Sequence, residues 1–150
     1  MGSYHQQIDM CKISQVTIED LPKINELENQ LNLNKTKLNF FNQTLLNENF
    51  KFIKLISEKE IIGFLQFSWN KSECDIISIG VKKKFQKMNY GKKLVGHLKN
   101  LNFKNIYAEV SINNKNAIMF YRRLRFLKIG LRKSYYKKKR SDAILLKLKT

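Results

Sequence analysis

The chain has 150 residues, 43% of them hydrophobic, which suits one folded domain and argues against a disordered segment. Its 29 Lys and Arg against 12 Asp and Glu give a net charge of +17, which favours polyanionic surroundings such as RNA, ribosomes or phosphorylated cofactors, although an Asn-, Ile- and Lys-rich composition accounts for part of that excess. The chain has only two cysteines and no C-x-x-C pair, which argues against a disulfide framework and a structural zinc site. It has no apolar run near the roughly 20 residues of a membrane span and no signal-peptide pattern, which argues against a membrane anchor. We therefore expect a soluble cytoplasmic protein with reduced, buried thiols and no metal.

The first half of the chain predicts strands and helices after a flexible polar lead-in over residues 1–9. Asp20 and Pro22 predict a helix start with Asp20 as N-cap and the proline in the first turn. In the next helix Leu38, Phe41 and Leu45 share one side. The predicted elements are a strand over 11–16, helices over 20–31 and 36–46, and strands over 50–56 and 61–69.

The two strands over 50–56 and 61–69 are joined by a short charged turn and predict a β-hairpin. Gly63 lies inside the second strand. A glycine there predicts a bulge or a close approach of another backbone.

Residues 76–101 form the segment on which the interpretation of the chain depends. A short β-branched run over 76–81 predicts a strand, and Leu94, Val95, Leu98 and Leu101 recur at helical spacing. The ten residues between them are rich in lysine and end on Gly91. A loop that leaves a strand and opens a helix presents unpaired N–H groups at the positive end of the helix dipole. It therefore predicts either a phosphate site or a solvated basic loop.

The remaining residues predict an alternation of strands and one short helix. The predicted elements are a strand over 106–110, a helix over 117–124, and strands over 127–135 and 143–148. Together with the first half, this order predicts an α/β (α+β) domain with a mixed sheet.

Three features of the second half could carry chemistry. Glu109 lies within a predicted strand, where its carboxylate is either on the solvent face of an edge strand or in a cleft as a general base. Tyr121 lies on the last helix and could be a catalytic phenol or core packing. Lys137 to Arg140 is a cationic run beside Tyr135 and Tyr136, whose rings offer stacking faces for RNA or a substrate, the alternative being a solvated hairpin tip.

Two patterns in this half resemble those of the GNAT family of acetyl-CoA-dependent N-acetyltransferases. The family's cofactor loop, Gln/Arg-x-x-Gly-x-Gly/Ala, is matched by Gln86 to Gly91, and its pattern Asn-x-x-Ala-x-x-φ-Tyr-x-x-x-Gly-Phe is matched by Asn114 to Phe126. Segments 108–110, 132–136 and 142–144 resemble the RimI-type ribosomal-protein-alanine N-acetyltransferases. The resemblance covers about residues 13–148. It implies a single GNAT domain over 1–150, with a mixed, mostly antiparallel seven-stranded sheet and about four flanking helices.

The chain departs from the family's patterns at three places. Asn89 stands for the first loop glycine, and asparagine is the non-glycine residue that best tolerates a left-handed backbone. Arg125 stands for the glycine before Phe126, and the sequence offers no compensating residue. The region 31–42 lacks the Pro-Trp pair that is frequent in the RimI-type subfamily, which bears on the choice of acceptor.

The resemblance implies direct acetyl transfer from acetyl-CoA to a protein N-terminal α-amine in a ternary complex, with the N-terminal alanine of a ribosomal protein as the expected acceptor. Glu109 would take a proton from the α-ammonium through water, and Tyr121 would protonate the departing thiolate. A main-chain N–H of Val81 or a neighbour would stabilise the oxyanion. The implied cofactor-binding residues are Ile79, Val81, Gln86, Lys87, Met88, Asn89, Tyr90, Gly91, Lys92, Asn114 and Ala117; Tyr135 and Tyr136 are expected to contact the substrate.

Three alternatives remain open at this point. One is a GNAT enzyme that acts on a small amine, and a second is a protein lysine acetyltransferase. The third is a degenerate GNAT scaffold used as a ribosome- or RNA-binding module, which the +17 charge and the substitutions at Asn89 and Arg125 favour. Retention of four family residues together argues against that third alternative: Gln86, Glu109, Asn114 and Tyr121.

Overall fold

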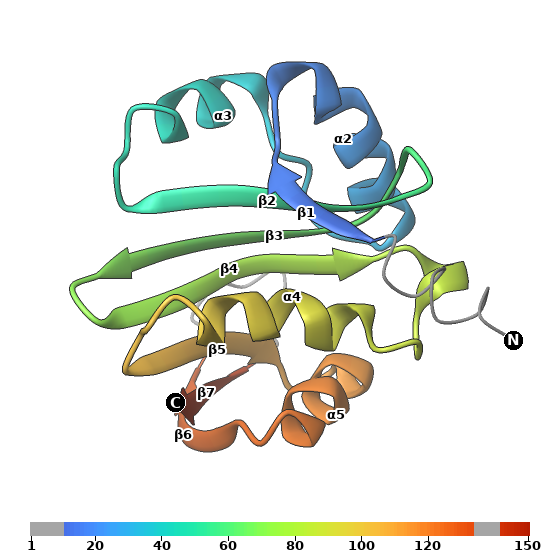
Figure 1. Cartoon of the computed structure of the whole chain (residues 1–150). Coiled ribbons are helices and arrows are strands. Elements are labelled where there is room, and N and C mark those ends of the chain that lie inside the picture. The colour runs from blue at the N-terminus through green and yellow to red at the C-terminus, as the bar shows by residue number, and fades with distance from the viewer. Residues whose placement is uncertain (1–10, 134–141) are drawn as a thin grey trace, which may run out of the picture. The chain divides into compact units, whose positions relative to one another are not determined.

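The computed structural model describes residues 11–133 and 142–150, and it has the mixed sheet and the helices expected from the sequence (Figure 1). The sheet has seven strands in the order β1-β2-β3-β4-β5-β7-β6. The pairing of β4 with β5 is parallel, whereas β1–β2, β2–β3, β5–β7 and β6–β7 are antiparallel. The elements are β1 (Lys12–Gln15), η1 (Ile18–Asp20), α2 (Leu21–Gln30), α3 (Leu38–Thr44), β2 (Phe50–Ser57), β3 (Glu60–Asn70), β4 (Glu73–Val81), η2 (Lys83–Phe85), α4 (Tyr90–Lys99), β5 (Asn105–Ser111), α5 (Lys115–Arg123), β6 (Leu127–Arg132) and β7 (Ala143–Lys149).

These elements belong to two compact units. The first unit comprises the described residues up to Ser68 together with Ile77–Gly96, and the second comprises Trp69–Ile76 together with the described residues from His97 onward. The polypeptide therefore passes from one unit to the other within β3, β4 and α4. The single domain over 1–150 that the sequence predicts stays a prediction.

The core of the first unit forms where two helices cover one side of the sheet (Figure 1). Helix α2 buries Leu21, Ile24 and Leu27 at helical spacing, as its pattern predicts. Phe41 of α3 contacts Phe52 edge-on, with ring centroids 6.4 Å apart. Burial of such apolar surface is the main stabilising contribution in a unit of this size.

Helix α3 is shorter than predicted, and its apolar side is only partly buried. The expected helix covered 36–46, but Thr36 is held by side chains outside the helix and α3 begins at Leu38. Of the three residues predicted to share one side, only Phe41 is buried, whereas Leu38 and Leu45 are about half exposed. A helix of two turns presents a narrow face, so this apolar side is buried only at Phe41.

A buried carboxylate fixes the segment between α2 and α3. Glu28 is 1% exposed and accepts hydrogen bonds from the backbone N–H of Thr36 at 3.0 Å and from its hydroxyl at 2.6 Å. Asn25 donates to Glu28 at 2.9 Å, and Gln66 donates to the Thr36 hydroxyl at 2.8 Å. A buried charge without such partners is destabilising, so this connection is held in one conformation.

Asp20 occupies the N-cap position of α2, but its side chain makes no cap hydrogen bond to that helix. Its carboxylate instead accepts from the backbone N–H of Thr17 at 2.8 Å and from Lys54 Nζ at 2.5 Å. Burial on its own would raise the pKa of Asp20, but the bonds from Lys54 and Thr17 outweigh it and lower that pKa. Asp20 therefore closes the turn before the helix and links it to β2.

Gly63 lies at a bulge and also at a close approach of another backbone, the two alternatives that its sequence position predicts. The register of β2 with β3 shifts beside it, because Leu55 pairs with Gly63 and Ile56 pairs with Ile61. A Cβ atom at Gly63 would also meet the carbonyl oxygen of Gly80 on β4 at 2.9 Å. No side chain larger than hydrogen fits at Gly63 without movement of the neighbouring backbone.

The second unit is built on β5, which lies between β4 and β7. Residues Glu73–Asp75 of β4 pair with Asn105–Tyr107, and all seven residues of β5 pair with β7. Strand β6 pairs with β7 at the end of the strand order. The core is made by Ile106, Leu146, Leu148, Phe126, Leu124 and Tyr121.

Both cysteines are free and buried, as predicted. Cys11 belongs to the first unit and Cys74 to the second. Burial, followed by the charge of Asp75, raises the pKa of Cys74 to about 12. Among the described residues, no helix is long and apolar enough to cross a membrane.

Candidate functional site

The loop between β4 and α4 leads into the N-terminus of a helix through a backbone that is partly left-handed. Two of its residues have a left-handed backbone, Lys87 with φ 64° and Asn89 with φ 68°. The carbonyl of Asn89 accepts the first helical hydrogen bond, from Lys93 N at 3.0 Å. The N–H groups of the first helical turn, which begins at Tyr90, have no partners within the helix and carry its partial positive charge. Such concave N–H groups bind phosphate.

The lysines around this loop differ in how they are engaged. Lys82 forms an ion pair with Glu60, and Lys93 donates to the carbonyl of Cys11 at 3.1 Å. Four further lysines are exposed and form no ion pair among the described residues: Lys83, Lys84, Lys87 and Lys92. Lys84 lies over the ring of Phe85, and the other three are cations of the loop without such a contact in the described part of the chain.

Tyr90, the first residue of α4, anchors the loop. Its ring packs edge-on against Phe85, with centroids 6.0 Å apart. A hydrogen bond with the thiol of Cys11, more than burial, raises the pKa of Tyr90. The half-buried Tyr90 is thus a structural contact of the loop, whereas the preceding residues 86–89 are exposed.

Gln86 turns its side chain back to the strand. Its amide Nε2 donates to the carbonyl of Val81 at 2.8 Å, which ties the start of the loop to the end of β4. The N–H of Lys82 is taken by the carbonyl of Ile62 at 2.8 Å, so it is not the neighbour of Val81 that could stabilise an oxyanion. Ile79 and Val81 are half-buried at this end of the strand.

In the second unit, Glu109 lies on the exposed face of β5. Its side chain is 44% exposed, and Arg132 of β6 donates from Nε to its carboxylate at 3.2 Å. The placement on an edge strand is wrong, because β5 is an inner strand; the exposed face is right. Sequence reasoning missed Arg132 as the partner of Glu109, since only the pairing of β5, β7 and β6 brings the two side chains together.

Tyr121 is buried on α5, 5% exposed. Its ring packs against Phe120 and Phe126, with centroids 5.1 Å and 5.0 Å apart. Burial raises the pKa of Tyr121, so the phenol keeps its proton at neutral pH. A general acid must be protonated before it can donate a proton, and the buried phenol of Tyr121 is protonated.

Asn114 and Ala117 form the start of α5. The Oδ1 atom of Asn114 accepts from the backbone N–H of Ala117 at 3.1 Å, which makes Asn114 the N-cap. The sequence pattern Asn-x-x-Ala carries this signal, since an asparagine three residues before a helical N–H is a typical N-cap. Asn114 is exposed.

Tyr135 and Tyr136, together with the cationic run 137–140, lie outside the described residues. Within the described ranges, no group of three or more His, Cys, Asp and Glu is arranged to hold a metal ion.

Comparison with known proteins identifies the family of the chain. Residues 16–126 match the model of the acetyltransferase (GNAT) family. The chain belongs to the GNAT family. It is therefore an acyltransferase, as the two sequence patterns indicated.

Several GNAT proteins are similar over most of the chain. The [ribosomal protein bS18]-alanine N-acetyltransferase of Haemophilus influenzae is 29% identical over 136 residues, which are 86% of this chain and 90% of that protein. The N-alpha-acetyltransferase RimI of Mycobacterium tuberculosis is 27% identical, covering 71% of each chain.

The solved structures agree with this fold. The ribosomal-protein-S18-alanine N-acetyltransferase of Escherichia coli superposes with a TM-score of 0.79 at 24% identity, covering 93% of this chain and 94% of that one. NAA60 of Arabidopsis thaliana in complex with acetyl-CoA gives a TM-score of 0.77 at 15% identity, covering 93% and 98%. The fold of a GNAT acetyltransferase is thereby established for the chain.

The two residues that replace glycine in the GNAT patterns keep the backbone that glycine would provide. Asn89 has φ 68° and Arg125 has φ 72°, both in the left-handed region. After α5, Arg125 N donates to Arg122 O at 2.9 Å and Phe126 N donates to Tyr121 O at 3.0 Å, the two bonds of a Schellman turn. The ring contact between Tyr121 and Phe126 is the apolar contact that accompanies such a turn. These bonds are the compensation for Arg125 that the sequence did not reveal.

Proposed function

We propose that the chain transfers an acetyl group from acetyl-CoA to the N-terminal α-amine of a protein, with an alanine-initiated ribosomal protein as acceptor. The observation that carries the proposal is the left-handed backbone of Asn89 in a loop that opens α4, because this is the conformation that a loop glycine would adopt and a helix start favours an anion. The transfer is direct, within a ternary complex of enzyme, acetyl-CoA and acceptor.

The residues present fit the pyrophosphate of acetyl-CoA. Lys87 to Lys92 would hold it through backbone N–H groups, and the exposed Lys83, Lys87 and Lys92 would add charge. The N–H of Gln86 already donates to the carbonyl of Lys83 at 3.1 Å, so Gln86 would contribute by tying the loop to the end of β4 through its side chain. Ile79 and Val81 would pair with the pantetheine through their backbone, and Asn114 and Ala117 would contact the cofactor from α5. When bound, acetyl-CoA supplies the acetyl group as an activated thioester.

Glu109 is proposed as the base that takes a proton from the acceptor's α-ammonium through water. The free α-amine of a peptide has a pKa near 8, so an exposed carboxylate and water suffice for this step. The ion pair with Arg132 keeps the carboxylate oriented, and the incoming ammonium competes with the guanidinium for it. Because both side chains are exposed, this ion pair is weak enough to be displaced.

Tyr121 is proposed as the acid that returns a proton to the departing thiolate. Its burial keeps the phenol protonated, and its ring is held between Phe120 and Phe126 so that the hydroxyl has a fixed position. The N–H of Val81 is the remaining candidate for stabilising negative charge that develops on the acetyl oxygen.

The proposed acceptor is supported by similarity to two enzymes that are named for N-terminal acetylation. The H. influenzae protein is named for alanine of ribosomal protein bS18, and the M. tuberculosis protein is named an N-alpha-acetyltransferase. A net charge of +17 also suits a protein that meets its acceptor in ribosomal surroundings.

The test combines acetyl-CoA calorimetry with a thiol-release assay on an alanine-initiated ribosomal peptide. Tyr121→Phe keeps the ring packing and removes the proton donor. It is therefore expected to keep acetyl-CoA binding and lower kcat by about 100-fold. Tyr107→Phe is the matched control, since Tyr107 is a half-buried tyrosine of the same unit, and it should leave kcat unchanged. Equal activity of wild type and Tyr121→Phe would remove Tyr121 from the mechanism.

The second candidate function is a GNAT scaffold that binds ribosomal RNA without catalysis. The +17 charge favours it, whereas the retained left-handed turns at Asn89 and Arg125 weaken the argument from lost glycines. Absence of acetyl-CoA binding together with retained rRNA binding would decide for this candidate.

A further inference from the structure

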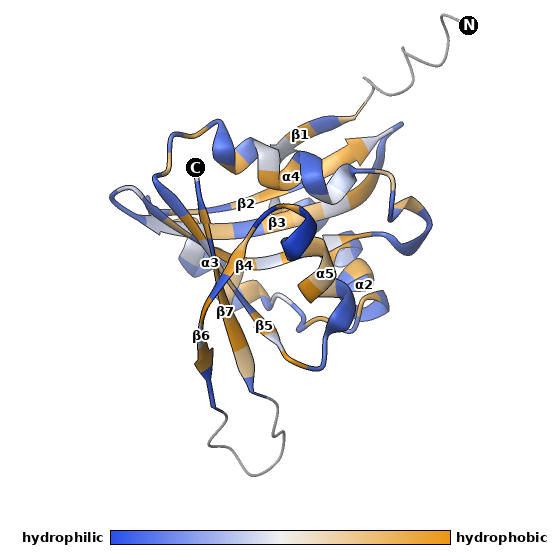
Figure 2. Ribbon diagram, turned by 90° about the horizontal axis from the view of Figure 1, so that it is seen from below, coloured by the Kyte–Doolittle hydropathy of each residue, from blue (hydrophilic) through white to orange (hydrophobic). Residues whose placement is uncertain are grey.

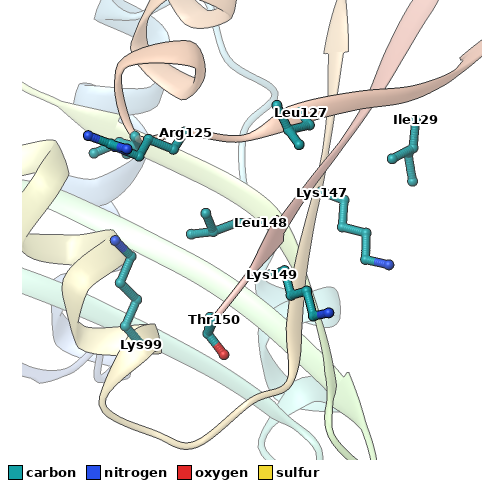
Figure 3. A pocket seen from close by; sticks show the side chains of 9 residues that line it. Lys99, Arg125, Leu127, Ile129, Lys147, Leu148, Lys149 and Thr150 are labelled. Atoms are coloured by element: carbon teal, nitrogen blue, oxygen red, sulfur yellow. The ribbon is translucent and has the colours of Figure 1, made fainter.

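A groove in the second unit lies outside the residues proposed for acetyl transfer. Its volume is about 680 Å³, within the range of ligand pockets. It lies around the end of β7 (Figure 3). The lining residues are Lys99, Leu124, Arg125, Leu127, Ile129, Lys147, Leu148, Lys149 and Thr150. We refer to it as the β7 groove.

The charged side chains of the β7 groove have one sign. Four of its nine lining residues have cationic side chains, and none has an acidic side chain. Lys99 and Arg125 lie on one side of β7, and Lys147 and Lys149 point to the other (Figure 3). Within the described part of the chain, none of these four side chains forms an ion pair. Their separation along three elements suits several negative charges spaced along a chain better than one compact anion.

The floor of the groove is aliphatic and belongs partly to an outer strand. Leu127 is 71% exposed and Ile129 is 54% exposed on β6, whose position beside β7 and hydrophobic stretches are visible in Figure 2. The register shift between Lys128 and Gly130 leaves Ile129 outside the pairing with β7. Among the described strands, β6 pairs with β7 alone, so its other edge is free to pair with an extended segment.

Arg125 gives the groove a guanidinium at a strained position. Its φ of 72° lies in the left-handed region, where glycine has the lowest conformational energy of all residues. A residue such as arginine, which has a Cβ atom, is strained there and destabilises the turn. Glycine would satisfy the same two Schellman hydrogen bonds, which use only backbone atoms. A strained residue that the turn does not require points to a role for its side chain.

We propose that the β7 groove binds an extended acidic segment of a partner protein, in which acidic and aliphatic residues alternate. The aliphatic side chains pack on Leu127 and Ile129, and the carboxylates pair with Arg125 and the three lysines. A second copy that docks through the same groove does not fit, because it would bring two sets of four cations together. Nucleic acid fits less well, because the lining offers no aromatic ring for base stacking.

The experiment is fluorescence anisotropy of the full chain with a fluorescein-labelled octapeptide of alternating glutamate and leucine. Arg125→Gly removes the guanidinium and also relieves the backbone, so it should weaken binding by about tenfold while the protein becomes more stable. Leu127→Ser combined with Ile129→Ser should weaken binding by about the same factor. Lys51→Glu, an exposed charge change on β2 of the first unit, is the matched control for Lys149→Glu.

The expected result is that Lys149→Glu, Arg125→Gly and the double serine variant lose binding, whereas Lys51→Glu keeps most of it. Equal affinity for an octapeptide of alternating glutamate and serine would overturn the proposal, since the aliphatic floor would then contribute nothing. Unchanged affinity of Arg125→Gly would also overturn it. Binding of anionic phospholipid vesicles or of an eight-nucleotide single strand more strongly than the peptide would also overturn the proposal and assign the groove to a membrane or to nucleic acid. Self-association in sedimentation without peptide would assign it to a second copy of the chain.

Discussion

Two turns of the molecule use a left-handed residue where the GNAT patterns have glycine, and they hold that residue in different ways. In the first unit Asn89 has φ 68° within an exposed loop. In the second unit Arg125 has φ 72° within a Schellman turn closed by two backbone hydrogen bonds and the packed rings of Tyr121 and Phe126. Asparagine enters this region at little cost, whereas arginine has to be held there by its surroundings.

The difference between the two turns predicts whether a substitution changes ligand binding or stability. The Asn89 turn has few fixed neighbours, so a poorer residue there should change the shape of the loop and hence anion binding. The Arg125 turn is part of a packed core, so a change there should alter the free energy of unfolding.

The largest effect is expected from breaking the packing of the second turn. Tyr121→Ala removes a buried ring that contacts Phe126, and the free energy of unfolding should fall by about 3 to 5 kcal/mol. Urea denaturation followed by circular dichroism measures this. Met119→Ala, at an exposed position of the same helix, is the control and should change it by less than about 0.5 kcal/mol. A similar loss for both variants would show that Tyr121 has no special part in the turn.

A β-branched residue in the first turn should act on binding. Asn89→Val places a side chain that avoids φ near +68°, so acetyl-CoA affinity should fall by about tenfold, with little change in melting temperature. Isothermal titration measures the affinity, and Asn89→Gly should retain it. If Asn89→Val lowers stability and leaves affinity intact, the contrast between the two turns fails.

The reverse substitution in the second turn should stabilise the protein. Arg125→Gly relieves a left-handed arginine and keeps both Schellman bonds, so the free energy of unfolding should rise by about 1 kcal/mol. Thermal and urea unfolding measure the change. Arg123→Gly, inside the last turn of α5, is the control and should destabilise by about 1 kcal/mol. A decrease for Arg125→Gly would mean that the guanidinium stabilises the fold.

The smallest effect is expected at a third turn, the one before α2, which the carboxylate of Asp20 closes. Because the pKa of Asp20 is lowered in the folded state, its carboxylate adds stability that is fully present above the ordinary value of 3.8 and is lost as pH falls through the folded pKa. Asp20→Asn should therefore destabilise by about 1 kcal/mol at pH 7 and by much less at the lowest pH at which the protein stays folded. Melting temperatures across this range test it, and a pH-independent difference would contradict it.

Much of the fold could be predicted because its signals are local. Period-2 and period-3.6 patterns located the strands and helices to within a few residues. Gly63 predicted a bulge or a close backbone approach, and the structure has both. The buried face of α3 could not be predicted, since a helix of two turns is positioned by its neighbours. The bonds of Glu28 to Thr36 and Gln66 depend on three separate elements, which no local pattern reveals.

The site divides in the same way. Asn89 as a left-handed residue followed from its intrinsic preference, and the structure agrees. The ion pair of Glu109 with Arg132 depends on the order of β5, β7 and β6, and the thiol contact of Tyr90 with Cys11 joins residues far apart in the chain. Such pairs follow from topology, and one sequence taken alone does not contain that information.

The two buried cysteines give the molecule a native pair of reporters, one for each unit. Cys74 is completely buried, and the raised pKa of about 12 leaves its thiol almost entirely protonated, so an alkylating reagent should reach it only when the second unit opens. Cys11 is buried in the first unit and should report the opening of that unit. Labelling rates of the two thiols, followed by mass spectrometry in the unmodified protein, would then show whether the units open together or one before the other.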